Sequence, residues 1–344
     1  MAKHIPPPSH QNCNETGIVV GWDEYKFDQF QTTDKYDRTI TFYLLESPAE
    51  PRGGASKLSL FVYLNGSGGG SVFAPQGARF VGSNLYENFL RPSAGRARLL
   101  LVEKPGVQLH EEPAEWGTAE GCSVEFLREN TLERWTEAVN AAIIAAQTLD
   151  GIDSTRILVA GHSEGGYVAT KVGAFNPKVT HVASIAAGGP TQLFDLVYFA
   201  EKRPESINLD TGKVDSSNDA IEKMYAKWKE FQDDPTSIDK FFGKHPFNRW
   251  SSYCASSPLE ALLNSQAKAY LVHGTLDTAT PVISFDIMRA ELTMKRRDIV
   301  CERIEGADHA IKIAENGETR NELPNVPARI VEWFFESHSH LHDV

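Results

Sequence analysis

The feature that most constrains the fold is a serine placed between a short, largely apolar run and a helical pattern. Residues 156–160 form a strand-like segment that leads directly into Gly161, and residues 164–175 continue with helical spacing. The joint reads GHSEGG, so Ser163 has a glycine two positions before it and another, Gly165, two positions after it. This G-x-S-x-G spacing is typical of a sharp strand-to-helix turn, because only small residues at those two positions avoid a backbone clash.

Strands and helices alternate along much of the chain. The clearest helix is expected over residues 132–149, where Asn130 and Glu133 match a capping box and Gly151 closes the pattern. Apolar strands that alternate with helices predict an α/β fold, with a mostly parallel central sheet and helices on both faces. The other expected strands are residues 39–45, 58–64, 98–102, 179–186, 269–272 and 299–304, the last of them nearer to an edge.

The segment 190–266 interrupts this alternation with helical, aromatic-rich sequence. We expect it to form a helical cap inserted into an α/β core made of residues 1–189 and 267–344. Residues 220–231 are amphipathic, and their apolar stripe is expected to pack on the core, with lining of a substrate pocket as the alternative. A second cluster in the cap is expected to serve packing: His245, Phe247, Arg249, Trp250 and Tyr253.

Composition and charge exclude several classes of protein. Of the 344 residues, 41% are hydrophobic and 23% are charged, which is typical of soluble globular proteins. The 46 acidic residues outnumber the 34 basic ones, giving a formal charge of −12, so nucleic-acid and anionic-membrane partners are disfavoured. No apolar run reaches the ~20 residues of a membrane span. The start of the chain has no apolar signal core, which favours a cytoplasmic location and leaves a processed periplasmic or secreted form open.

No metal ion or organic cofactor is expected. The tail histidines His338, His340 and His342 alternate, but a terminal tail offers no supporting contacts to fix ligand geometry. The four cysteines lack the C-x-x-C spacing of zinc and redox sites, and we expect free buried thiols, with a disulfide as the alternative. They are Cys13, Cys122, Cys254 and Cys301.

A serine becomes a strong nucleophile only with a base that a carboxylate holds in place. Asp277 follows the strand expected at residues 269–272, within HGTLDTATPV, and is the predicted acid. His309 lies in GADHA, after the next strand, and is the predicted base. The order Ser163, Asp277, His309 is the one found in α/β-hydrolases rather than in chymotrypsin or subtilisin.

Other polar residues near these motifs have weaker claims. Asp195 is a substitute for the acid, and Asp308 adjoins His309 too closely in sequence to orient it. His162 and His273 are expected to be structural, since the first points away from the serine and the second ends a strand.

A glycine-rich loop, NGSGGG at residues 65–70, follows the strand that ends at Leu64. A phosphate-binding loop is disfavoured because no Lys-Ser or Lys-Thr follows the glycines. We interpret the loop as half of an oxyanion hole, in which the backbone N–H of Ser67 joins that of Glu164. Gly66 and Gly68 are the alternatives to Ser67.

The motifs GHSEGG, HGTLDTATPV and GADHA resemble those of the α/β-hydrolase superfamily, and most of all its dienelactone-hydrolase and prolyl-oligopeptidase-like serine hydrolases. The resemblance runs from residue 58 to the C-terminus and implies the α/β-hydrolase fold, with residues 1–57 supplying leading antiparallel strands. It implies cleavage of a carboxylic ester or related acyl bond of a small molecule through an acyl-enzyme intermediate.

The sequence departs from the family pattern at two places. Asn65-Gly66 stands where many members have His-Gly, and residues 103–106 stand where many have a D-x-R-G-like turn. A thioesterase, a prolyl-oligopeptidase-like peptidase and a non-catalytic binding protein on the same fold are the alternatives, and the oligomeric state stays open.

Overall fold

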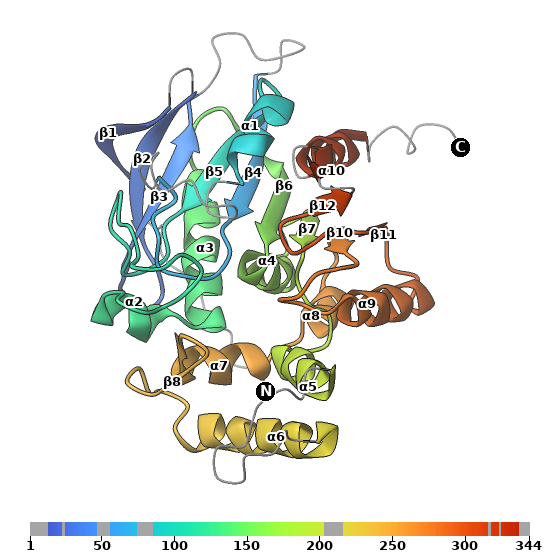
Figure 1. Cartoon of the computed structure of the whole chain (residues 1–344). Helices are drawn as coiled ribbons and strands as arrows, with labels where there is room; N and C mark the ends of the chain where they lie inside the picture. Colours follow the sequence, from blue (N-terminus) through green and yellow to red (C-terminus); the bar gives the residue numbers. More distant parts are fainter. Residues whose placement is uncertain are drawn as a thin grey trace, which may run out of the picture.

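A computed structural model describes residues 13–22, 25–46, 56–73, 85–202, 216–315, 318–322 and 325–336. The tail histidines His338, His340 and His342 lie outside the described residues. The centre of the molecule is a nine-stranded sheet in the order β1-β2-β3-β5-β4-β6-β7-β10-β11 (Figure 1). Its strands are β1 Asn14–Trp22, β2 Tyr25–Thr33, β3 Thr39–Leu45, β4 Leu58–Leu64, β5 Ala97–Val102, β6 Ile152–His162, β7 His181–Ile185, β10 Lys268–Gly274 and β11 Ile299–Ile304.

The sheet is mostly parallel, as the sequence predicts. Strands β5, β4, β6, β7, β10 and β11 pair in parallel, whereas β1, β2 and β3 form an antiparallel leading part, in which β3 is antiparallel to β5. The strand at Ile299–Ile304 lies at the edge, as expected. Because β4 and β6 are neighbours, the loops that follow Leu64 and His162 begin side by side at one edge of the sheet.

Helices cover both faces of the sheet. Alternate residues of β4 serve the two cores: Leu60 and Val62 pack with α3 and α4, whereas Phe61 and Tyr63 pack with α1 and α10. Continuous apolar runs therefore mark strands that are buried on both sides. The helices are α1 Glu87–Ser93, α2 Val124–Glu129, α3 Leu132–Ala146, α4 Glu164–Phe175, α5 Gln192–Lys202, α6 Ser217–Asp233, α7 Phe247–Cys254, α8 Pro258–Asn264, α9 Val282–Met294 and α10 Asn325–Glu336.

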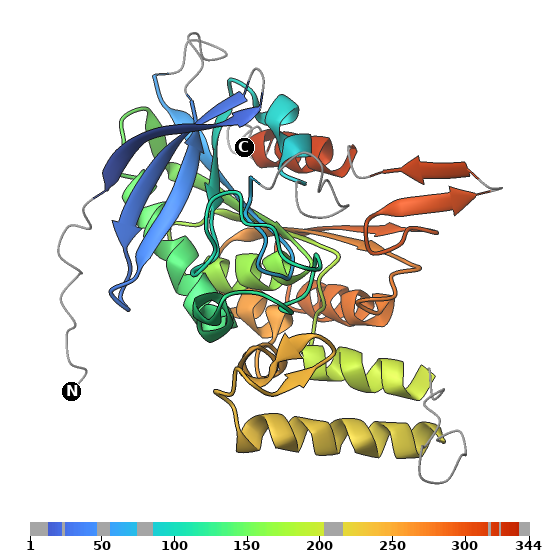
Figure 2. The same ribbon diagram turned by 60° about the vertical axis from the view of Figure 1, so that its left-hand side comes forward.

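Several boundaries differ from those expected. Helix α3 ends at Ala146 rather than at residue 149, and Thr131 caps it in place of Asn130, because the Thr131 side chain accepts the N–H of Arg134. Strand β6 begins at Ile152, four residues early, with an irregular register against β4. Helices α1, α2 and α9 and the β12–β13 hairpin (Lys312–Glu315 and Glu318–Asn321) were not expected from the sequence. The hairpin projects from the body in Figure 2.

The segment 190–266 contains α5 to α8 and a small hairpin, β8 (Phe241–Phe242) with β9 (His245–Pro246). Helices α5 and α6 lie side by side with α7 nearby at one end of the molecule (Figures 1 and 2). Of the apolar side chains of α6, Phe231 packs within this group, stacked on Trp250 at 6.1 Å between ring centroids, whereas Tyr225 is exposed. Helix α8 instead packs on α4 and α9, and its Leu262 belongs to the main core. Across the described ranges, no helix is long and apolar enough to cross a membrane.

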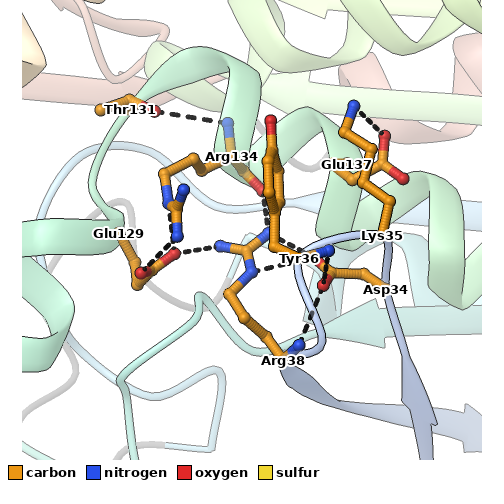
Figure 3. Close-up of polar contacts among 8 residues, drawn as sticks. All are labelled: Asp34, Lys35, Tyr36, Arg38, Glu129, Thr131, Arg134 and Glu137. Carbon is orange, nitrogen blue, oxygen red and sulfur yellow. Dashed lines mark hydrogen bonds and ion pairs between the residues drawn. The ribbon is translucent and has the colours of Figure 1, made fainter.

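An ion-pair network ties the β2–β3 hairpin to the start of α3 (Figure 3). The guanidinium of Arg38 binds the buried carboxylate of Asp34, the carboxylate of Glu129 and the carbonyl oxygen of Arg134. Arg134 in turn donates to Glu129 at 2.6 and 2.8 Å. The network joins the antiparallel edge of the sheet to a core helix about a hundred residues further along the chain.

We expect Arg38→Met to lower the free energy of unfolding by about 3 kcal/mol, because it leaves a buried carboxylate without its cation. Lys35→Met is the control. Its ammonium pairs with Glu137, but its side chain is 52% exposed, so a loss below about 1 kcal/mol is expected. Urea unfolding followed by tryptophan fluorescence measures the free energy of unfolding of both variants. Equal losses of this free energy would contradict the conclusion that the Arg38 network holds the β2–β3 hairpin on α3.

Candidate active site

The backbone around Ser163 is a strained turn between β6 and α4. Ser163 has φ 54° and ψ −121°, outside the regions that most side chains adopt. A Cβ atom at Gly161 would lie 2.2 Å from the backbone of Gly165, and one at Gly165 would lie 2.3 Å from the carbonyl oxygen of Leu64. The turn therefore requires glycine at both positions, as the sequence motif predicts.

The structure brings the three predicted triad residues into one chain of hydrogen bonds. His309 Nε2 lies 3.0 Å from Ser163 Oγ, and His309 Nδ1 lies 2.7 Å from Asp277 Oδ2. A carboxylate can only accept, so the Nδ1–H donates to Asp277 and Nε2 is left to accept the serine proton. This is the arrangement in which an imidazole activates a hydroxyl.

Asp277 is held by the turn that follows β10. Its Oδ1 accepts the backbone N–H groups of Ala279 and Thr280 at 2.8 and 2.9 Å. Burial raises the pKa of this carboxyl, but the hydrogen bond with His309, the charges of His309 and His273 and the hydrogen bond from the Thr280 N–H together outweigh burial and lower the pKa. The turn is docked closely on the loop of the base, because a Cβ atom at Gly274 would lie 2.3 Å from the Ala307 carbonyl oxygen.

His162, the neighbour of Ser163, is hydrogen-bonded to the backbone of the loop that carries His309. Its Nε2 donates to the backbone carbonyl of His309 at 2.8 Å. Burial, together with the charge of His309, lowers the pKa of His162 to about 3. It therefore stays neutral and acts as a tether for the His309 loop, which agrees with its expected structural role.

The predicted oxyanion-hole residues lie next to Ser163. A Cβ atom at Gly66 would be 3.6 Å from the Ser163 Cβ, so the glycine loop passes directly over the serine. The hydroxyl of Ser67 donates to the Gly117 carbonyl at 3.0 Å, while its backbone N–H has no acceptor in the described part of the chain. Glu164 opens α4, where first-turn N–H groups have no carbonyl partner within the helix.

A buried ion cluster beneath this loop was not anticipated. Glu164 Oε1 accepts from Lys104 Nζ at 3.0 Å, and Glu164 Oε2 accepts from Arg249 Nε and Nη2, both at 3.0 Å. Burial raises the pKa of Glu164, but the two cations outweigh it and lower the value to about 2. Arg249 was expected to serve packing, and in the structure it forms a buried ion pair with Glu164. The signal in the sequence was Lys104, a charged residue that follows Glu103 just after the apolar strand β5.

The rival carboxylates do not reach the base. Asp195 accepts from the hydroxyls of Tyr167, at 3.0 Å, and Ser284. Burial raises the pKa of Asp195 to about 7. Asp308 accepts the backbone N–H of Ala310. Both carboxylates are thus hydrogen-bonded to groups other than the His309 imidazole.

The described residues offer no group of three or more His, Cys, Asp or Glu side chains that could hold a metal ion. All four cysteines are free; Cys254 is buried and the other three are half-buried.

Comparison with solved structures identifies the fold. No protein-family model and no curated protein matches the sequence. Est1E from Butyrivibrio proteoclasticus superimposes with a TM-score of 0.53 at 15% identity, over 90% of this chain and 98% of that one. Acetyl xylan esterase 1 from Thermoanaerobacterium sp. gives 0.50 at 12% identity, over 94% and 88%. The acylaminoacyl peptidase of Pyrococcus horikoshii gives 0.54 at 14% identity, over 91% of this chain but only 41% of its own. The chain has the α/β-hydrolase fold, as its motifs imply.

The low pKa of His162 predicts a pH-dependent loss of stability. Its folded value of about 3 lies below its ordinary value of 6.5, so as the pH falls only the unfolded chain takes up this proton. Between pH 7 and pH 4.5 this costs about 2 to 3 kcal/mol of folding stability. His162→Gln keeps an N–H donor and does not titrate, so its stability should fall less over that range by about the same amount. Urea unfolding at several pH values measures this, and parallel curves for the two proteins would refute it.

Proposed function

We propose that this protein is a serine hydrolase that cleaves a carboxylic ester or a related acyl bond. The observation that carries the proposal is the unbroken hydrogen-bond chain from Ser163 through His309 to Asp277, with the serine on a strained turn. Strain of this kind persists only where the surrounding structure enforces it, and it is concentrated at functional sites.

The reaction proceeds in two steps. The Ser163 hydroxyl oxygen attacks the acyl carbonyl while its proton passes to His309 Nε2, which then gives that proton to the leaving oxygen as the acyl–oxygen bond breaks. Water attacks the acyl-enzyme by the same route and releases the acid. Asp277 holds the imidazole and stabilises its charged form, and the N–H groups of Ser67 and Glu164 bind the oxyanion.

Esters are the substrate class that the structural neighbours support best. One structure of Est1E holds ferulic acid, a carboxylic acid, and the second esterase is named for acetyl xylan. Both are matched over most of their length, whereas the acylaminoacyl peptidase is matched over less than half. We therefore place p-nitrophenyl acetate and methyl ferulate before thioesters and peptides as test substrates.

Replacing the nucleophile tests the assignment. Ser163→Ala should fold normally, fail to react with a fluorophosphonate probe and lose about 10⁴-fold or more in kcat on p-nitrophenyl acetate. Ser154→Ala, at an exposed serine, is the control and should match the wild type. If Ser163→Ala keeps more than about a hundredth of kcat, Ser163 is not the nucleophile. A wild-type protein that neither reacts with the probe nor hydrolyses an ester would instead be a non-catalytic binding protein.

Replacing each buried carboxylate in turn tests the acid. Asp277→Asn should lower kcat by about 10⁴-fold, because the amide no longer holds the imidazole with its proton on Nδ1. Asp195→Asn is the matched control, since Asp195 is equally buried but bonds to Tyr167 and Ser284. It should change the unfolding temperature and leave kcat within about threefold of wild type. If Asp195→Asn lowers kcat by about 10⁴-fold and Asp277→Asn leaves it nearly unchanged, Asp195 is the acid instead.

A further inference from the structure

The ammonium of Lys104 is enclosed between the glycine loop and the start of α4. Lys104 Nζ donates to the carbonyl oxygens of Gly66 at 2.6 Å and Gly68 at 3.0 Å, and to Glu164 Oε1 at 3.0 Å. It also lies 4.2 Å from the centre of the Trp135 ring, at a cation–π distance. Three acceptors match the three N–H donors of an ammonium, whereas a neutral amine has only two. The site is therefore built for the charged form of this lysine.

The two carbonyls that Lys104 binds belong to the loop over Ser163. The Gly66 carbonyl shares its peptide unit with the N–H of Ser67, and in a planar trans unit the C=O and N–H bonds point in opposite directions. Holding the carbonyl therefore fixes where the Ser67 N–H points. Glycine-rich backbone has no other strong conformational preference, so the loop depends on such an anchor.

The same contact changes the strength of the donor. A cation bound to a carbonyl polarises the whole peptide unit and makes its N–H a better donor, as in cooperative hydrogen-bond chains. Within the cluster, Arg249 pairs with Glu164, whereas only Lys104 also binds the loop carbonyls. All three side chains are at least nine-tenths buried, where a charge acts more strongly than in water.

We propose that Lys104 is a positioning residue of the oxyanion hole: by binding the Gly66 carbonyl it aims and strengthens the Ser67 N–H. This inference rests on the proposed hydrolase function of the same site. It also favours Ser67 over Gly68 as the loop's donor, because the Gly68 N–H shares its peptide unit with the Ser67 carbonyl, which Lys104 does not touch.

The test compares two cations that share one carboxylate. Lys104→Met and Arg249→Met each remove one buried positive charge from Glu164 and leave it one partner, but only Lys104 binds the loop. The readouts are kcat and KM for p-nitrophenyl acetate, the Ki of phenylboronic acid, whose serine adduct is tetrahedral, and the thermal unfolding temperature. Lys35→Met, at a half-exposed lysine on the β2–β3 hairpin, controls for the loss of a lysine.

Lys104→Met should lower kcat by about 10- to 100-fold and weaken the boronate by a similar factor, with KM within about threefold of wild type. Arg249→Met should destabilise the protein to a similar degree but change kcat by less than about threefold, and Lys35→Met should leave kcat unchanged. If Lys104→Met does not fold, Lys104→Gln replaces it: the shorter, neutral amide removes the cation from the loop, keeps a polar group in the site and leaves Glu164 paired with Arg249. The boronate should again be weakened while KM stays within about threefold of wild type.

Equal losses of kcat in Lys104→Met and Arg249→Met would overturn the inference, because Lys104 would then serve only to neutralise Glu164. If Lys104→Met has the same kcat as the wild type, and both proteins react with the fluorophosphonate probe, the inference about Lys104 is overturned while the proposed function stands. A wild-type protein with neither labelling nor ester hydrolysis would overturn both.

Discussion

The close backbone contact among Gly161, Gly165 and Leu64 is the constraint on which the rest of the site depends. It lets α4 begin directly over the ends of β4 and β6, so the loop that follows β4 passes beside the serine at the end of β6. Any side chain at either glycine would push the helix away from the sheet. The positions of Ser163, of the first N–H groups of α4 and of the glycine loop thus share one geometric origin.

Three buried charges then join parts of the chain that are far apart in sequence. Lys104 follows β5, Glu164 opens α4 and Arg249 lies on α7. Burying charges costs free energy that their mutual attraction offsets only when each is well paired. A cluster of this kind therefore contributes little to folding stability, but it fixes the relative positions of the elements that carry the three charges. Through Arg249 it holds α7 against the residue that follows the serine.

Sequence patterns predicted the parts of the fold that local rules determine. Strands β3, β4 and β11 and helix α4 begin and end where expected, since apolar runs and breakers mark them clearly. The residues Ser163, Asp277 and His309 could be selected because each follows a strand in a fixed order, and the structure brings them together. Partners joined across long separations, such as Glu164 with Arg249, leave no local pattern, and the four-residue strands of β12–β13 are too short and polar to stand out.

The loops that carry Asp277 and His309 are in close backbone contact, like the turn at Ser163. A Cβ atom at Gly274 would lie 2.3 Å from the Ala307 carbonyl oxygen, and one at Gly161 would lie 2.2 Å from the Gly165 backbone. Main-chain contacts at a few glycines thus set the relative positions of Ser163, Asp277 and His309, largely independently of which apolar side chains fill the core. Core residues can be exchanged for others of similar volume at modest cost. Exchanges among apolar core residues should consequently leave Ser163, Asp277 and His309 in register, whereas a side chain at one of these glycines should separate them.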